Sequence, residues 1–105
     1  MSLYIVHVHV HHDAVSEWEP YMHTHMEELL ATGCFTQAIL TRAPEADRDG
    51  TSGYRVLYHA LDEAALERYL THHAPALKRD HQERFEGRVE ATREILPVLK
   101  HTRHT

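Results

Sequence analysis

The sequence predicts an α+β fold of the ferredoxin-like kind, in one domain spanning residues 1–105. A chain of 105 residues is long enough for one hydrophobic core. Segments that alternate with the period of a strand stand beside segments with helical spacing, in the order strand, helix, strand, strand, helix, strand. No internal repeat competes with this order. We therefore expect an antiparallel four-stranded sheet with two helices on one face.

The first predicted strand covers residues 4–11, where apolar and polar residues alternate. The residues that should face the helices are Tyr4, Val6, Val8 and Val10. A helix follows, for which Asp13 or Ser16 is the expected cap. Its apolar stripe, at spacings of three and four, contains Trp18, Met22, Met26, Leu29 and Leu30. Gly33 is expected to end the helix, because a left-handed terminal position favours glycine.

The remaining strands are predicted at residues 35–42, 54–60 and 88–96. Residues 43–53 are polar and contain Pro and Gly, so they are expected to form the hairpin loop between the second and third strands. Residues 98–105 are expected to be a C-terminal tail. On the sheet face away from the helices we expect His7, His9, Arg55, Leu57 and His59.

The second predicted helix begins after Asp62, which is expected to cap it. Pro75 should interrupt this helix, because proline lacks an N–H group and clashes with the preceding turn. Beyond the interruption a further helical turn or two is expected, in which Leu77, His81 and Phe85 recur every four residues.

Composition excludes several classes of function. The chain has 11 Lys+Arg against 16 Asp+Glu, a formal charge of −5, so it lacks the basic surface that nucleic acid requires. No apolar run approaches the roughly 20 residues of a membrane helix, and the N-terminal residues do not resemble a signal peptide. The single cysteine, Cys34, indicates a reducing compartment. We therefore expect a cytoplasmic protein without nucleic-acid or membrane partners.

Several stretches together resemble a family of small bacterial proteins of unknown function with a ferredoxin-like, dimeric α/β-barrel fold. The matching segments are Trp18, Met22 and His25, then residues 30–33, 35–36, 54–58, 68–69 and 74–77, and Phe85. The resemblance implies this fold and a homodimer, but no established activity. Wider relatives of the dimeric barrel include cofactor-independent monooxygenases, haem proteins and enzymes of small aromatic compounds, which is analogy of fold alone.

Two functional hypotheses follow for a dimer of this kind. The first is a non-enzymatic domain, either structural or enclosing a small-molecule ligand near His25, Arg55 and His59. The alternative is an enzyme of the cofactor-independent monooxygenase kind, in which His25 or His59 accepts a proton from a small aromatic substrate. The sequence leaves open whether the protein is an enzyme.

The third hypothesis is a divalent-metal site, the one cofactor that the sequence suggests. The chain contains 12 histidines, and His7 and His9 should point to the same side of the first strand. His59 could join them from the neighbouring third strand. The competing interpretation is a set of polar residues facing solvent or a second subunit. We do not expect His81 and Asp80 to act as a base and its orienting group, because adjacent helix positions point in different directions.

Overall fold

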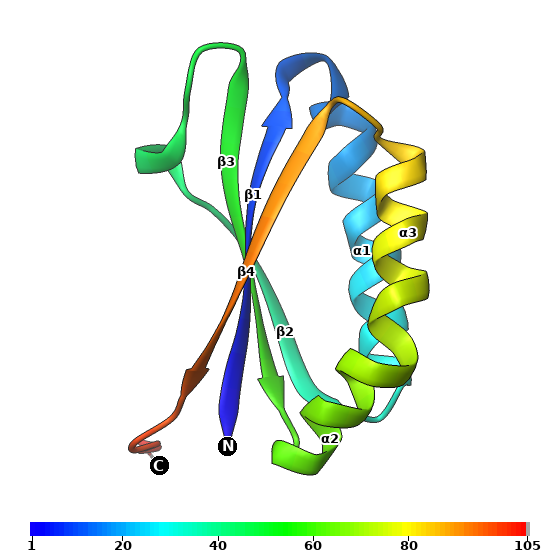
Figure 1. Ribbon diagram of the computed structural model, residues 1–105. Helices are drawn as coiled ribbons and strands as arrows, with labels where there is room; N and C mark the ends of the chain where they lie inside the picture. The colour runs from blue at the N-terminus through cyan, green and yellow to red at the C-terminus, as the bar shows by residue number, and fades with distance from the viewer. Residues whose placement is uncertain (105) are drawn as a thin grey trace.

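The computed structural model describes residues 1–104 as an antiparallel sheet of four strands, with helices packed on one face (Figure 1). The elements in chain order are β1 (Ser2–His11), α1 (Val15–Ala31), β2 (Phe35–Arg42), β3 (Thr51–Ala60), α2 (Glu63–Arg68), α3 (Ala74–Arg84) and β4 (Val89–Pro97). The strands lie in the order β2-β3-β1-β4, so β1 and β3 are neighbours at the centre. This is the predicted ferredoxin-like α+β fold.

The start of α1 differs from the sequence expectation. A short 3₁₀ turn, η1 (His12–Ala14), precedes the helix. The N-cap position of α1 is Ala14, and no side chain forms a capping hydrogen bond there. Neither Asp13 nor Ser16 therefore caps the helix. The end of α1 is as predicted, because Gly33 adopts a φ of +76°, which side chains other than glycine disfavour.

The second helix is interrupted, as predicted, just before Pro75. The segment η3 (Tyr69–His73) is π-helical and joins α2 to α3. Proline cannot donate a backbone hydrogen bond, so the regular α-helical pattern cannot run through this point. At the start of α2, Asp62 Oδ1 accepts a hydrogen bond of 2.7 Å from the Ala65 N–H, which confirms Asp62 as the cap.

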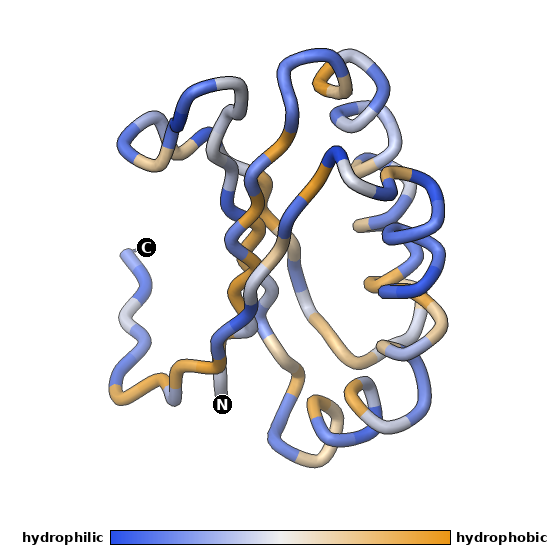
Figure 2. The backbone as a smooth tube through the Cα atoms, turned by 45° about the horizontal axis from the view of Figure 1, so that its top comes forward, coloured by the Kyte–Doolittle hydropathy of each residue, from blue (hydrophilic) through white to orange (hydrophobic). Residues whose placement is uncertain are grey.

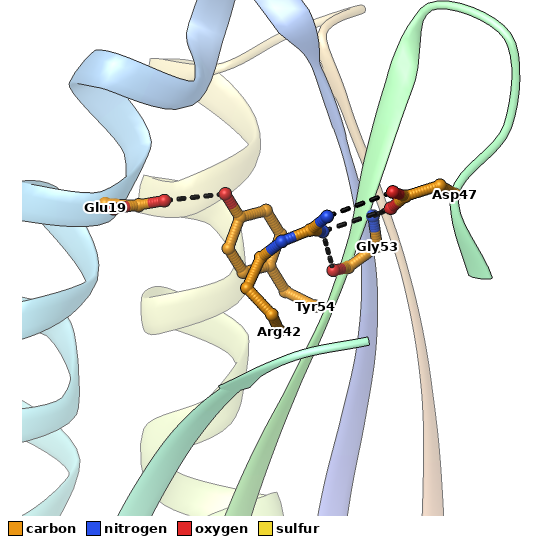
Figure 3. A network of polar contacts seen from close by, with 5 residues as sticks. All are labelled: Glu19, Arg42, Asp47, Gly53 and Tyr54. Carbon is orange, nitrogen blue, oxygen red and sulfur yellow. Dashed lines mark hydrogen bonds and ion pairs between the residues drawn. The ribbon is translucent and has the colours of Figure 1, made fainter. Parts of the chain in front are cut away.

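The hairpin between β2 and β3 is shorter than predicted, because β3 begins at Thr51. Asp47 holds the hairpin: it accepts two hydrogen bonds of 3.0 Å from the Arg42 guanidinium and one of 2.7 Å from the Gly53 N–H (Figure 3). A Cβ atom at Gly53 would lie 2.6 Å from the Ala43 carbonyl oxygen, so this close approach requires glycine. The glycine that suggested a loop in the sequence is thus part of a strand.

The core lies between the helix layer and the sheet. Its largest fully buried side chains are Val10, Trp18, Leu29, Cys34, Val56, Tyr58 and Phe85. Apolar residues are frequent along the strands, whereas α3 is largely hydrophilic (Figure 2). The chain leaves β4 on the side of the sheet away from the helices (Figures 1 and 2). The predicted tail 98–105 includes Thr105, which lies outside the described residues. No helix within residues 1–104 has the length and apolar character needed to cross a membrane.

Candidate functional site

A recess opens between the helix layer and the sheet, with a volume of about 30 Å³. Its floor is formed by the central strands β1 and β3, and its walls by α1, η3, α3 and the edge strand β4. The tyrosines that line it are Tyr4, Tyr58 and Tyr69, one from each of β1, β3 and η3. Burial raises the pKa of Tyr58 and Tyr69, so both phenols stay protonated at neutral pH.

His81 is the more buried of the two histidines in the recess, with an exposed fraction of 8%. Its Nε2 atom accepts a hydrogen bond of 3.0 Å from the indole N–H of Trp18 in α1. An accepting Nε2 carries no proton, so neutral His81 holds its proton on Nδ1. Burial lowers the pKa of His81 to about 4, with His25 and Arg93 acting in the same direction. The imidazole is therefore uncharged at neutral pH.

His25 lies beside His81, with ring centroids 5.9 Å apart, and comes from α1. Its Nδ1 atom is buried and has no hydrogen-bond partner among residues 1–104. The ring stacks on Tyr21 at 5.5 Å, and the Tyr21 hydroxyl donates a hydrogen bond to Asp80 in α3. Burial lowers the pKa of His25, and the charge of Asp80 opposes that effect. The recess therefore contains a second neutral imidazole, whose Nδ1 is unpaired.

Trp18 connects this site to the hairpin. Its ring packs against Tyr54 with centroids 4.6 Å apart, and the guanidinium of Arg42 lies 5.1 Å from the centre of the Tyr54 ring. Figure 3 shows the Tyr54 hydroxyl donating to Glu19 of α1, a hydrogen bond of 2.6 Å. These contacts fix α1, and with it the indole that orients His81.

Two cations border the recess, Lys78 from α3 and Arg93 from β4. Arg93 pairs across the sheet with Val6, so its side chain stands on the helix face. Lys78 is half-buried, and its pKa is lowered by burial and by the positive charge of Arg93. No carboxylate lines the recess among the described residues.

The recess adjoins a larger groove between α3 and β4, with a volume of about 510 Å³. Lys78, His81 and Arg93 line both. The apolar wall of the groove is formed by Phe85, Val89 and Ala91. A concave space of this size, with an apolar wall and a few convergent polar groups, is typical of small-molecule sites.

Of the three ligand-binding residues predicted from the sequence, only His25 lies in the recess. Arg55 faces the opposite side of the sheet, where its Nε donates to His7 Nδ1 at 3.3 Å and its Nη1 lies 3.0 Å from Glu45 Oε1. His59 stands on the same outer face, paired across the sheet with Leu3. The structure therefore does not bring His25 together with the other two.

The structure does not bring His59 together with His7 and His9, the other two histidines of the predicted metal site; His9 pairs with Gly53, further along β1 from His59 than His7 is. His7 pairs with Arg55, whereas His59 pairs with Leu3, four residues away along β1. At about 3.3 Å per strand residue, this register separates their backbones by more than ~10 Å along the sheet. His7 instead lies 3.6 Å from Glu94. Within residues 1–104 no three His, Cys, Asp or Glu side chains gather in a metal-ligand arrangement.

Sequence reasoning missed His81, Lys78 and Arg93. A signal for His81 was present, because it follows Leu77 and precedes Phe85 at a spacing of four, within the stripe that should be buried. Arg93 carried a similar signal, as the charged residue among the apolar positions of its strand, Val89, Ala91, Arg93 and Ile95. In both cases a polar residue occupied a position at which the period required an apolar one.

Comparison with solved structures identifies the class of fold. SnoaB from Streptomyces nogalater, a cofactor-independent oxygenase, is similar with a TM-score of 0.69 and 17% identity, over 95% of each chain. A mutant of MhuD with two manganese protoporphyrin IX molecules bound per active site is similar with a TM-score of 0.72 and 16% identity, over 99% of this chain and 100% of that one. A dimeric ferredoxin-like protein from an uncultured marine organism is similar with a TM-score of 0.58 and 12% identity, over 96% of this chain and 98% of that one. At these identities the likeness shows the ferredoxin-like fold alone.

Comparison with protein families is more specific. Residues 1–99 match the family described as a domain of unknown function, DUF4286. The chain belongs to this family, which agrees with the predicted membership of a family without an established activity. No curated protein matches the chain.

Proposed function

We propose that this protein binds a small organic molecule between its helix layer and its sheet. The observation that carries the proposal is the unpaired Nδ1 atom of His25, buried beside a recess. Buried polar atoms nearly always have a partner, and one without a partner costs about 1–3 kcal/mol. A polar group of a bound molecule would supply that partner.

The dimensions support a ligand that spans the recess and the groove. A volume of about 30 Å³ admits only a few atoms, such as one polar functional group. The adjoining groove, at about 510 Å³, lies within the range of roughly 300–1,000 Å³ that is usual for ligand pockets. The polar end of the ligand would enter the recess, and its apolar body would lie against Phe85 and Val89.

The probe that tests this proposal is 4-nitrophenol, titrated into isotope-labelled protein and followed by NMR. We expect saturable shifts of the Trp18 indole N–H and of the His25 and His81 imidazole signals. Val6→Phe, which fills the recess from β1, should abolish the shifts. Ile39→Phe on the outer face of the sheet is the matched control and should retain them. Shifts that miss these three residues, or that survive Val6→Phe, contradict the proposal.

A second candidate is catalysis in which His25 accepts a proton from a bound phenol. Its supporting observation is the buried, unpaired Nδ1 atom of His25, which lies beside the recess and can accept a proton while the imidazole is neutral. The description of SnoaB as a cofactor-independent oxygenase belongs to that protein and makes this chemistry worth testing here. Bound 4-nitrophenol should show its phenolate absorbance at a pH where the free compound is protonated. His25→Leu should remove that absorbance, and an unchanged spectrum would argue against the proton transfer.

We further propose that the protein is a cytoplasmic homodimer in which a second copy covers the outer face of the sheet. The apolar residues of this face include Ile39 and Leu96, each 43% exposed, beside half-buried Leu57. A solved protein of this fold is described as dimeric, which supports the same assembly at the level of fold. The single buried cysteine, Cys34, suits a reducing compartment.

A further inference from the structure

The recess has two cations and no carboxylate among its described lining residues, whereas the groove is also lined by Arg79, Glu83 and Glu86. Lys78 and Arg93 stand on opposite walls, one from α3 and one from β4, and each lines both spaces. The nearest acidic neighbour on α3, Asp80, accepts the hydrogen bond of the Tyr21 hydroxyl instead. The two cations are close enough for Arg93 to lower the pKa of Lys78.

This imbalance stands out in a chain with five more acidic than basic residues. Arg42, Arg55 and Arg88 each lie within 4.0 Å of a carboxylate, whereas Lys78 and Arg93 have no such partner within residues 1–104. Arg93 is itself exposed, as is Arg84 on the surface of α3; unlike Arg84, Arg93 lines the recess. Lys78 is half-buried, so water compensates its charge less completely.

The other polar groups of the recess suit an anion as well. The neutral His81 holds its proton on Nδ1, because Nε2 is occupied by Trp18, and therefore offers a donor. The neutral His25 can also carry its proton on the unpaired Nδ1. The phenols of Tyr58 and Tyr69 stay protonated and are donors too. The recess thus contains several donors, two cations and, among the described residues, no carboxylate.

We propose that the site selects an aromatic monocarboxylate, with its carboxylate in the recess between Lys78 and Arg93 and its ring in the groove against Phe85 and Val89. This inference rests on the proposed small-molecule function and specifies its ligand class. The planar guanidinium of Arg93 matches a carboxylate in geometry, and a carboxylate fits a space of about 30 Å³. Binding relieves the repulsion between the two cations and gives His25 Nδ1 its partner.

The test compares three probes of similar shape: benzoate, benzyl alcohol and benzylamine. Affinities are measured by calorimetry at low ionic strength, with NMR shifts of Trp18, His25 and His81 as the indicator of position. Benzoate should bind about tenfold or more tightly than benzyl alcohol, since hydrogen bonds to charged groups are stronger than those between neutral groups. Benzylamine should not bind. Added salt should lower the affinity for benzoate and leave the affinity for benzyl alcohol nearly unchanged.

Variants identify the groups responsible. Lys78→Gln and Arg93→Gln should each lower the affinity for benzoate about tenfold and lower the affinity for benzyl alcohol much less. Arg84→Gln makes the same change in net charge from an exposed position on α3 and should have no effect. Thermal melts of each variant confirm that it is folded, and Arg93→Lys, which keeps the charge, should recover part of the benzoate affinity.

The outcomes separate the two proposals. If benzyl alcohol binds in the recess as tightly as benzoate, selection for an anion is wrong and small-molecule binding stands. Failure of all three probes and of 4-nitrophenol to shift Trp18, His25 and His81 overturns both. An equal loss of benzoate affinity in Arg84→Gln would show that binding responds to net charge alone. It would contradict the proposal that Lys78 and Arg93 hold the carboxylate.

Discussion

The hydrogen bond between Trp18 and His81 joins residues that are 63 positions apart in the sequence. It satisfies the indole N–H inside the core, fixes the proton of His81 on Nδ1, and holds α1 against α3. A buried imidazole that accepts a hydrogen bond is neutral, and charging it would break the bond. At the scale of the residue, the site therefore depends on an uncharged pair of histidines.

This dependence predicts a loss of stability in mild acid. The folded-state pKa of His81 is lowered from 6.5 to about 4, so the unfolded chain binds the proton more readily. The free energy of unfolding should be unaffected above pH 6.5 and should fall as the pH drops towards 4. At about 1.4 kcal/mol for each pKa unit, His81 alone accounts for on the order of 3 kcal/mol at pH 4. The titratable and charged groups near it are Tyr21, His25, Asp80 and Arg93, and His25 should add to the loss because its pKa is also lowered.

Urea denaturation between about pH 7.5 and 4 measures this effect. His81→Gln can still accept from the Trp18 indole but does not titrate, so its stability should fall less steeply with pH. His23→Gln, an exposed position on α1, is the control and should follow the wild-type profile. Parallel profiles for His81→Gln and the wild type would show that His81 is not responsible.

At the scale of the element, two aspartates that look alike in the sequence have different roles. Asp13 and Asp62 both come before a predicted helix, and residue type makes each of them a candidate cap. In the structure Asp62 accepts a backbone N–H and Asp13 does not, because Asp13 lies inside the 3₁₀ turn η1 and Ala14 occupies the N-cap position of α1. Capping depends on the backbone geometry at the junction, which the residue type alone does not specify.

Asp62→Ala should therefore lower the free energy of unfolding by about 1 kcal/mol, the usual cost of losing a cap. Asp13→Ala is the matched control and should cost clearly less, since its carboxylate forms no cap hydrogen bond. Chemical denaturation of both variants provides the comparison. An equal loss in the two would contradict the capping assignment.

At the scale of the whole molecule, the two faces of the sheet carry different sets of side chains. The helix face contains the recess with its histidines and cations, whereas the outer face presents half-buried apolar and histidine side chains. A domain of about 100 residues buries only part of its apolar surface, so a second copy on the open face would add to its stability. Because they lie on opposite faces, separate substitutions can test the proposed ligand binding and the proposed dimer.

Leu57→Glu should convert the proposed dimer to a monomer, because it places a charge at the centre of the outer face, next to Ile5 and Ile39 in the sheet. Leu30→Glu makes the same change on the solvent side of α1 and should leave the mass unchanged. Sedimentation equilibrium measures both. A wild-type protein that is monomeric at every concentration would exclude this assembly.

The sequence by itself determined the order of elements, the helix-facing side of β1, the end of α1 at Gly33 and the break before Pro75. These features are local, because side-chain period, a left-handed residue and a missing N–H act within a few positions. Only the tertiary structure decided that His25 meets His81 and Arg93, and that His59 lies far from His7. Those relations depend on strand register and on how the helices cross the sheet, which are fixed by the packing of the whole core rather than by any one segment.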